Sequence, residues 1–224
     1  MLYSQNPITT CCFHSTNNNI VFAGLQDGYL YIFQYWCTVF YYIISYILIR
    51  SICLWDLREE ESWHQKIIDK LNEMDWVIRS PTYSTAGIWE NEAHSSSIVS
   101  IKTLSNVDCD EAEDLNDKFI SIQICSLDED GRLIIWSVLR NLRHNIEDLG
   151  LSQWGRVKLV KSQEVPLFVK KLELNGVKKE FIDMNVDSVD NNNLYLATND
   201  TNILSANYIG GRHNTPFYKL SEMG

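Results

Sequence analysis

The chain has 224 residues, of which 45% are hydrophobic and 21% charged. These proportions are those of an ordinary globular protein and exclude collagen, a coiled coil and wholesale disorder. The formal net charge of −10 argues against a general nucleic-acid binder, because neutralising phosphates requires clustered Lys and Arg. Composition therefore favours another protein as the partner.

The N-terminal residues and the cysteines indicate the compartment. Residues 1–10 lack the basic start and the apolar stretch of a secretory signal peptide, so none is expected. The chain contains no C-x-x-C pair, and several of its cysteines stand in apolar runs where a reduced thiol packs as a small hydrophobe. We therefore expect a reducing compartment for the six cysteines, Cys11, Cys12, Cys37, Cys53, Cys109 and Cys125.

The first predicted hairpin is interrupted. A strand is expected over 9–14, and the run VFAGLQDG (21–28) then ends in an Asp-Gly pair, which tolerates the positive φ of a tight turn. The matching strand SICLWDLRE (51–59) follows only after an uncharged apolar segment, YLYIFQYWCTVFYYIISYILI (29–49), and Arg50. This segment is long enough to span a bilayer as a helix.

The same hairpin recurs without interruption further along the chain. A strand over 97–104 precedes IQICSLDEDG-RLIIWSVLR (122–140), in which Trp136 occupies the place of Trp55. A strand over 180–187 precedes a degenerate third copy, LYLATNDTN-ILSAN (194–207), which has Thr-Asn at its turn and no Trp. A unit of strand, loop, strand, Asp-Gly turn, strand and Trp is typical of a propeller blade.

We therefore predict an all-β chain that forms a partial WD-repeat β-propeller of about three blades with an incomplete ring. The expected first blade is 8–28 plus 51–58, the second 59–140 and the third 141–207, followed by a tail over 208–224. Without the insert the two Asp-Gly turns are 81 residues apart, too far for one compact blade. We assign the excess to a helical insertion over 59–75 and an acidic loop over 105–117, with an outer strand over 76–84 that Pro81 confines to an edge.

The apolar segment has two interpretations. Read alone, 29–49 is a membrane span, and the insert would form a helix or extended strands in the fold. A hairpin turn is, however, a poor place for a span, because the flanking strands must pair with each other. Since removing 29–50 restores a continuous hairpin, our hypothesis is an in-frame retained intron or a gene-model error.

With the insert set aside, the chain resembles the WD-repeat intermediate chains of cytoplasmic dynein 2, the retrograde motor of intraflagellar transport. The resemblance covers nearly the whole chain, and its more particular motifs are RSPTYSTAG (79–87) and DLGLSQWGRVKLV (148–160). It implies a scaffold that binds the motor heavy chain and the other intermediate chain in the cytoplasm, cilium and cytoskeleton. Light chains attach in this family to an extended N-terminal region that this sequence lacks, so we do not expect them.

The candidate site residues are of two kinds, and no cofactor, metal or catalytic residue is expected. Fold residues of the repeat are expected at the turns, at the Trp positions and at a histidine that this superfamily often places in a network with Asp, Ser and Trp. They are Asp27, Gly28, Trp55, Asp56, His94, Asp130, Gly131 and Trp136. Partner contacts are expected among charged or aromatic residues at strand ends, namely Arg58, Arg79, Tyr83 and Arg132.

Other site types fit the sequence less well. The five histidines are scattered, and the Asp-rich turn lacks the final Glu of a calcium loop. The acceptor Asn199-Asp200-Thr201 matters only in a secreted protein. The competing functions are a membrane-anchored protein with one span at 29–49, and a WD-repeat adaptor of another complex.

Overall fold

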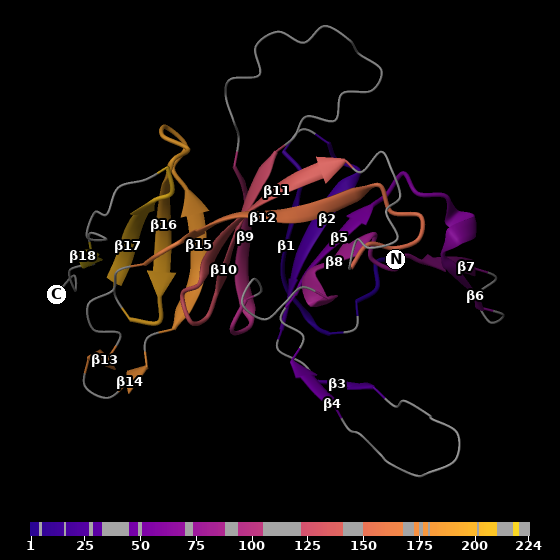
Figure 1. Cartoon of the computed structure of the whole chain (residues 1–224), viewed down its shortest axis with the longest axis horizontal. Coiled ribbons are helices and arrows are strands. Elements are labelled where there is room, and N and C mark those ends of the chain that lie inside the picture. The colour runs from indigo at the N-terminus through magenta and orange to yellow at the C-terminus, as the bar shows by residue number, and fades with distance from the viewer. Residues whose placement is uncertain are drawn as a thin grey trace, which may run out of the picture.

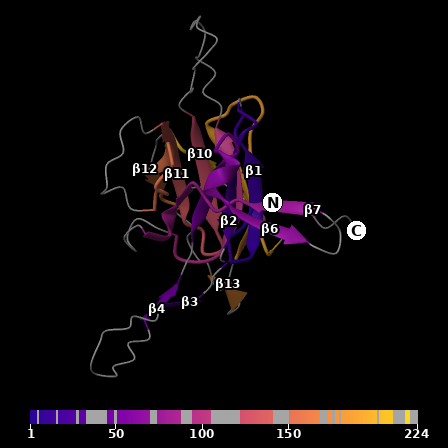
Figure 2. The same ribbon diagram turned by 90° about the vertical axis from the view of Figure 1, so that its right-hand side faces the viewer.

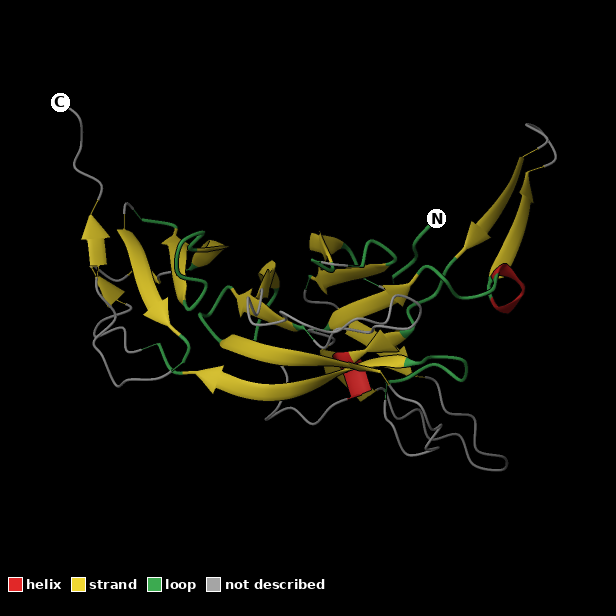
Figure 3. Cartoon of the chain, turned by 90° about the horizontal axis from the view of Figure 1, so that it is seen from above, coloured by secondary structure: helices red, strands yellow, loops and turns green. Residues whose placement is uncertain are grey.

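The computed structural model consists almost wholly of antiparallel β-sheets (Figure 1). It describes residues 1–4, 6–15, 17–26, 29–32, 45–48, 51–69, 74–87, 94–104, 122–140, 150–167, 173–174, 177–178, 180–200, 202–209 and 217–219. Three four-stranded sheets stand side by side in an open arc when seen from above (Figure 3). The prediction of an all-β, partial propeller is confirmed.

The first sheet has the order β1 (Ile8–Phe13), β2 (Ile20–Leu25), β5 (Ile52–Asp56) and β8 (Tyr83–Ser84). All of β2 and β5 is buried, as expected of strands covered on both faces. Strand β8 is too short to accept hydrogen bonds from all the outward-facing backbone N–H groups of β5, and the hydroxyls of two buried threonines accept the remaining ones. The hydroxyl of Thr85 accepts from the N–H of Ile52 at 2.9 Å, and that of Thr82 accepts from the N–H of Asp56 at 2.8 Å.

The second sheet has the order β12 (Val157–Val165), β11 (Leu133–Arg140), β10 (Gln123–Asp128) and β9 (Ile98–Leu104). Its β10–β11 turn contains Gly131 at φ +88°, the left-handed conformation that glycine adopts without strain. A Cβ at this position would lie 2.3 Å from the Phe181 ring, so the neighbouring sheet also requires a glycine here.

The third sheet has the order β15 (Phe181–Val186), β16 (Asn193–Thr198), β17 (Asn202–Asn207) and β18 (Phe217–Lys219). At its β16–β17 turn the hydroxyl of Thr198 contacts the Asp200 carboxylate and donates to the carbonyl of Asn202 at 3.0 Å. Side-chain hydrogen bonds thus hold this turn without an Asp-Gly pair.

Two hydrophobic cores hold the sheets together. The first lies between the first two sheets and includes Phe22, Leu54, Ile124 and Trp136. The second lies between the second and third sheets and includes residues such as Leu133 and Phe181. Each sheet buries its apolar face against its neighbour, as stacked repeats do.

Strand pairing divides the chain differently from the expected blade boundaries. Tyr83–Ser84, placed by sequence in the second blade, pairs with β5 of the first sheet. Strand β12, placed in the third blade, pairs with β11 of the second sheet. Each outer strand follows a long connection, so its partner could not be read from a local turn.

The predicted helix over 59–75 is wrong. The described residues of this stretch form a 3-10 turn, η1 (Glu61–Trp63), and a hairpin of β6 (Gln65–Asp69) and β7 (Met74–Ile78), which projects from the body in Figure 2. Its apolar residues have near-helical spacing, but they are largely β-branched or aromatic, and the N-terminus adds further pairing. The N-terminal amine donates to the Val77 carbonyl at 2.8 Å, and Leu2 forms a parallel bridge with Arg79. Tertiary pairing overrode the helical pattern.

The remaining elements are small. Within the insert, β3 (Tyr29–Ile32) pairs with β4 (Ser45–Leu48), and elsewhere β13 (Glu173–Leu174) pairs with β14 (Val177–Lys178). A second 3-10 turn, η2, covers Thr85–Gly87. The acidic loop over 105–117 lies outside the described residues. No helix among the described residues is long and apolar enough to cross a membrane.

Candidate functional site

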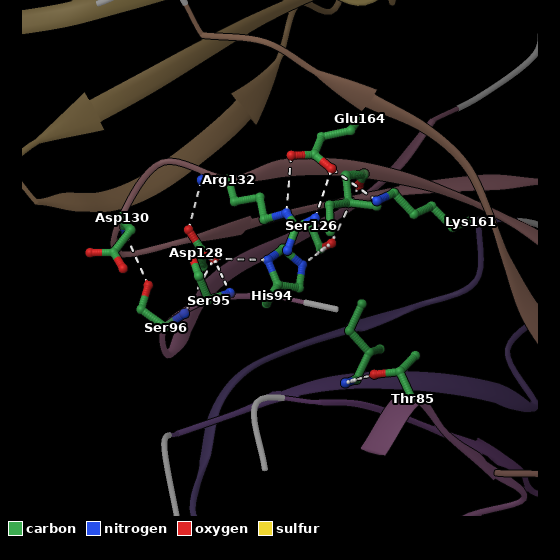
Figure 4. A network of polar contacts seen from close by, with 12 residues as sticks. Thr85, His94, Ser95, Ser96, Ser126, Asp128, Asp130, Arg132, Lys161 and Glu164 are labelled. Carbon is green, nitrogen blue, oxygen red and sulfur yellow. Dashed lines mark hydrogen bonds and ion pairs between the residues drawn. The ribbon is translucent and has the colours of Figure 1, made fainter. Parts of the chain in front are cut away.

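A buried chain of hydrogen bonds crosses the second sheet (Figure 4). The indole N–H of Trp136 donates to Ser126 Oγ at 2.8 Å, and the same Oγ lies 2.7 Å from His94 Nε2. His94 Nδ1 lies 3.2 Å from the carboxylate of Asp128. Because an ionised carboxylate can only accept, Nδ1–H donates to Asp128, whereas Ser126 Oγ accepts from the indole and has both Nε2 and the carbonyl of Ile134, at 3.3 Å, as further partners. We call these four residues the polar relay.

Asp128 anchors the end of the relay. Its carboxylate also accepts from the N–H and hydroxyl of Ser95 at 2.9 and 3.2 Å, and from the N–H of Arg132 at 2.7 Å. Burial alone would raise the pKa of this carboxyl. The hydrogen bond and charge of His94, helped by backbone N–H groups, hold the pKa below its ordinary value. The carboxylate therefore stays ionised and ties the loop before β9 to the β10–β11 turn.

The relay has the residue types of a hydrolytic Ser-His-Asp triad, but its position rules out that chemistry. Ser126 and Asp128 have no exposed surface, and the Trp136 indole occupies the space in front of the serine oxygen. A nucleophile must be reachable by a substrate carbonyl. The relay is thus a satisfied buried network that holds three chain segments together, namely the loop before β9, β10 and β11.

The other two sheets lack the relay. At the matching register, the first sheet has Ala23 and Leu25, and the Trp55 indole donates instead to the Arg79 carbonyl at 3.0 Å. The third sheet has Leu196 and Ala206 in the serine and tryptophan places. Only the middle sheet of the three therefore has this polar network.

The two distinctive sequence motifs meet at the outer edge of the first sheet. Ser84 N–H donates to the Gly150 carbonyl at 2.8 Å, and Ser152 N–H donates to the Thr82 carbonyl at 2.9 Å. Tyr83 and Leu151 form an antiparallel bridge between these bonds. The segment 150–155, just before β12, thereby attaches the second sheet to the first, and we call these contacts the clasp.

Glycine is required in the clasp. Gly150 adopts φ +84°, and a Cβ there would lie 2.0 Å from the backbone oxygen of Ser84. Gly155 is equally close-packed, since its Cβ would lie 2.8 Å from the Thr82 carbonyl oxygen. The spacing of the two glycines in LGLSQWG thus follows from the close approach of the two sheets.

Aromatic and ionisable side chains surround the clasp. The Trp154 indole donates to the Glu59 carboxylate at 3.1 Å, and the Trp154 ring packs edge to face on His64 at 5.8 Å. Burial raises the pKa of Glu59 and lowers that of His64, and their nearest atoms are 3.4 Å apart. Trp63 lies beside Trp154 and is 41% exposed.

The expected partner-contact residues lie in different environments. Arg58 forms a bidentate pair with Asp56 and remains the most exposed of the four. The Arg79 guanidinium donates to the Glu59 carbonyl at 2.9 Å and is largely covered. Tyr83 is buried in the first core, where no partner can reach it. Arg132 forms a bidentate pair with a carboxylate on β12.

The expected fold residues are partly visible. His94 and Trp136 lie in the relay, and the backbone N–H of Asp130 donates to the Ser96 hydroxyl at 2.9 Å. Asp27 and Gly28 lie outside the described residues. The sequence analysis did not identify Ser126 or the Gly150 clasp as structural features. Ser126 could have been found because it stands two residues before Asp128, on the same face of the predicted strand.

Comparisons with known proteins agree with the motifs. No protein-family model matches the chain. Two curated relatives, both named cytoplasmic dynein 2 intermediate chain 1, are each 28% identical over 179 residues, which is 75% of this chain. The chain spans 16% of the Mus musculus protein and 14% of the Homo sapiens protein. The expected resemblance to dynein 2 intermediate chains is confirmed.

Proposed function

We propose that this relative of the dynein 2 intermediate chains is a non-catalytic WD-repeat scaffold that binds the motor heavy chain. In this proposal the chain acts in retrograde intraflagellar transport and cilium assembly, and it also binds the other intermediate chain. The observation that carries the proposal is the arc of three repeated sheets, the first two of them joined by the clasp, in a chain similar to these subunits. Such an arc presents rigid sheets whose loops can contact partners.

The fold residues have a stabilising role in this proposal. The polar relay of the middle sheet and the Trp55 indole bond of the first sheet hold their strands to neighbouring loops. Arg58 and Arg132 remain candidates for partner contact, because rim guanidinium groups can exchange an internal carboxylate for one on a partner. Enzymatic activity has no part in the proposal, since the Ser-His-Asp group is buried in the core.

The experiment is a pull-down from ciliated cells with a tagged chain that lacks 29–50. Recovery of the dynein 2 heavy chain supports the proposal, and its absence beside recovery of a different complex supports the adaptor alternative. A chain with Gly150→Ala, which disturbs the clasp, should recover less heavy chain than the unmodified one.

The apolar insert is part of the proposal. We propose that residues 29–50 come from a retained intron or a gene-model error, because they separate two strands that still pair with each other. Gly24 faces Ile52, and Leu25 N–H donates to the Ser51 carbonyl at 3.1 Å across the insert. A transcript that uniformly encodes the insert would contradict this origin. Carbonate extraction tests the membrane alternative, which requires the chain to stay with the membranes.

A further inference from the structure

Strand β12 differs from the other outer strands. It has nine residues, whereas β8 and β18 have two and three. It is the last strand of its sheet, and no other described strand pairs with its outer side. A long edge strand leaves a row of backbone N–H and C=O groups that another extended chain can pair with.

Positive charge is concentrated along this edge. Five basic residues lie on β12, on the adjoining β11 or just before one of these strands, and one carboxylate accompanies them. They are Arg132, Arg140, Arg156, Lys158 and Lys161, with Glu164. Glu164 is paired with Arg132 and Lys161, both at 2.9 Å, and these contacts lower its pKa to about 2. In a chain with a net charge of −10, this edge is a local basic strip.

Apolar side chains stand between the charges. Val160 and Leu139 are 39% and 37% exposed, and the strand register places them on one face of the sheet beside Lys158. A strand laid along β12 would thus meet basic and apolar positions together on that face. Alternate side chains of an added strand point to the same face, so such a strand should combine acidic and β-branched residues.

We propose that β12 accepts an extended acidic segment of a partner protein by β-strand addition. The outer edge of β12, with which no described strand pairs, and its apolar neighbours favour a peptide over a nucleic acid, whose backbone cannot continue a β-ladder. This site goes beyond heavy-chain binding by the scaffold and does not depend on it, because it needs only the folded second sheet.

Fluorescence polarisation with the whole chain tests the proposal. The probe is a labelled peptide of about eight residues, Glu-Thr-Val-Thr repeated, which places Glu and Val alternately on one face and is matched in length to β12. Two matched peptides accompany it: one with Lys in place of Glu, and one that is N-methylated along both backbone edges, so that neither edge can form the ladder. We expect saturable binding of the Glu peptide, and at least tenfold weaker binding of the other two.

Variants of the chain complete the test. Reversal of two charges by Arg156→Glu and Lys158→Glu should weaken binding of the Glu peptide by roughly tenfold, since exposed charges contribute modestly each. Lys66→Glu on β6 is the control and should leave binding unchanged. Equal binding of the Lys or N-methylated peptide would overturn the proposal. Binding of single-stranded oligothymidylate in preference to the Glu peptide would also overturn it and indicate nucleic-acid binding.

The two proposals fail independently. If the double charge reversal unfolds the chain, the peptide comparison with the unmodified chain still decides the matter. Loss of peptide binding with normal heavy-chain recovery would refute strand addition alone, and the reverse result would refute only the scaffold function.

Discussion

Removing residues 29–50 should stabilise the chain. The N–H of Leu25 donates to the carbonyl of Ser51, as the N–H of Asp128 donates to that of Arg132 in the uninterrupted hairpin. Deletion leaves the three residues 26–28 between the bonded pair, the same length as 129–131 in the second sheet. Shortening this connection from 25 residues to three lowers the loop-closure cost by roughly 2 kcal/mol, from the logarithmic dependence on length.

Thermal unfolding by circular dichroism measures this gain. A stabilisation of roughly 2 kcal/mol should raise Tm by about 4–8 °C in a chain of this size. The matched control replaces the same 22 residues with a Gly/Ser linker and should not gain this rise in Tm, because loop length is unchanged and the β3–β4 pairing is lost. A deletion variant with a lower Tm, or without cooperative unfolding, would refute the assignment of 29–50 as an addition to a complete hairpin.

Three further changes test the relay, the clasp and the basic edge. Ser126→Ala should lower stability by at least about 2 kcal/mol in urea unfolding, because it leaves two buried nitrogens without a partner. Gly150→Ala should cost about 1–3 kcal/mol, since the added Cβ meets a backbone oxygen in a left-handed conformation, and heat-induced unfolding should occur at a lower temperature. Glu164 has a folded pKa of about 2, below its ordinary value of 4.5, so its contribution is present above pH 4.5 and lost as pH falls towards 2. Glu164→Gln should therefore lose less stability over that interval in urea titrations at several pH values.

Each of these changes has a control and a contrary result. Ser162→Ala alters an exposed hydroxyl and should change stability by less than Ser126→Ala; equal effects would argue against the relay. Ala86→Gly lies beside the clasp on the surface, and a Gly150→Ala chain as stable as this control would mean that the sheets are not in close contact. An unchanged acid profile for Glu164→Gln would show that its ion pairs do not form.

The hairpins were predictable because their signals are local. The pair Asp130-Gly131 predicts the turn, since glycine adopts the positive φ observed there, and the flanking apolar runs predict the strands. Trp55 and Trp136 showed that the turns are equivalent. The third hairpin was found without the Trp, because its strands still alternate around a turn held by Thr198 and Asp200.

The outer strands and the site were harder to predict because they depend on contacts distant in sequence. Strand β8 pairs with β5 about 30 residues earlier, and the clasp joins residues 82–84 to 150–152. Tyr83 looked like a surface aromatic at a strand end, yet its bridge to Leu151 places it in the core. The prediction of a helix over 59–75 was wrong for the same reason. The spacing of apolar residues in this stretch carries no information about its pairing with the N-terminus.

Binding to purified dynein 2 heavy chain tests the central claim most directly. The chain without 29–50 is immobilised, and heavy chain is titrated over it by biolayer interferometry, with the Gly150→Ala chain as the disturbed counterpart. The scaffold proposal predicts saturable binding that weakens in the disturbed chain. Heavy-chain binding no stronger than that of an unrelated protein of similar charge would contradict the scaffold proposal.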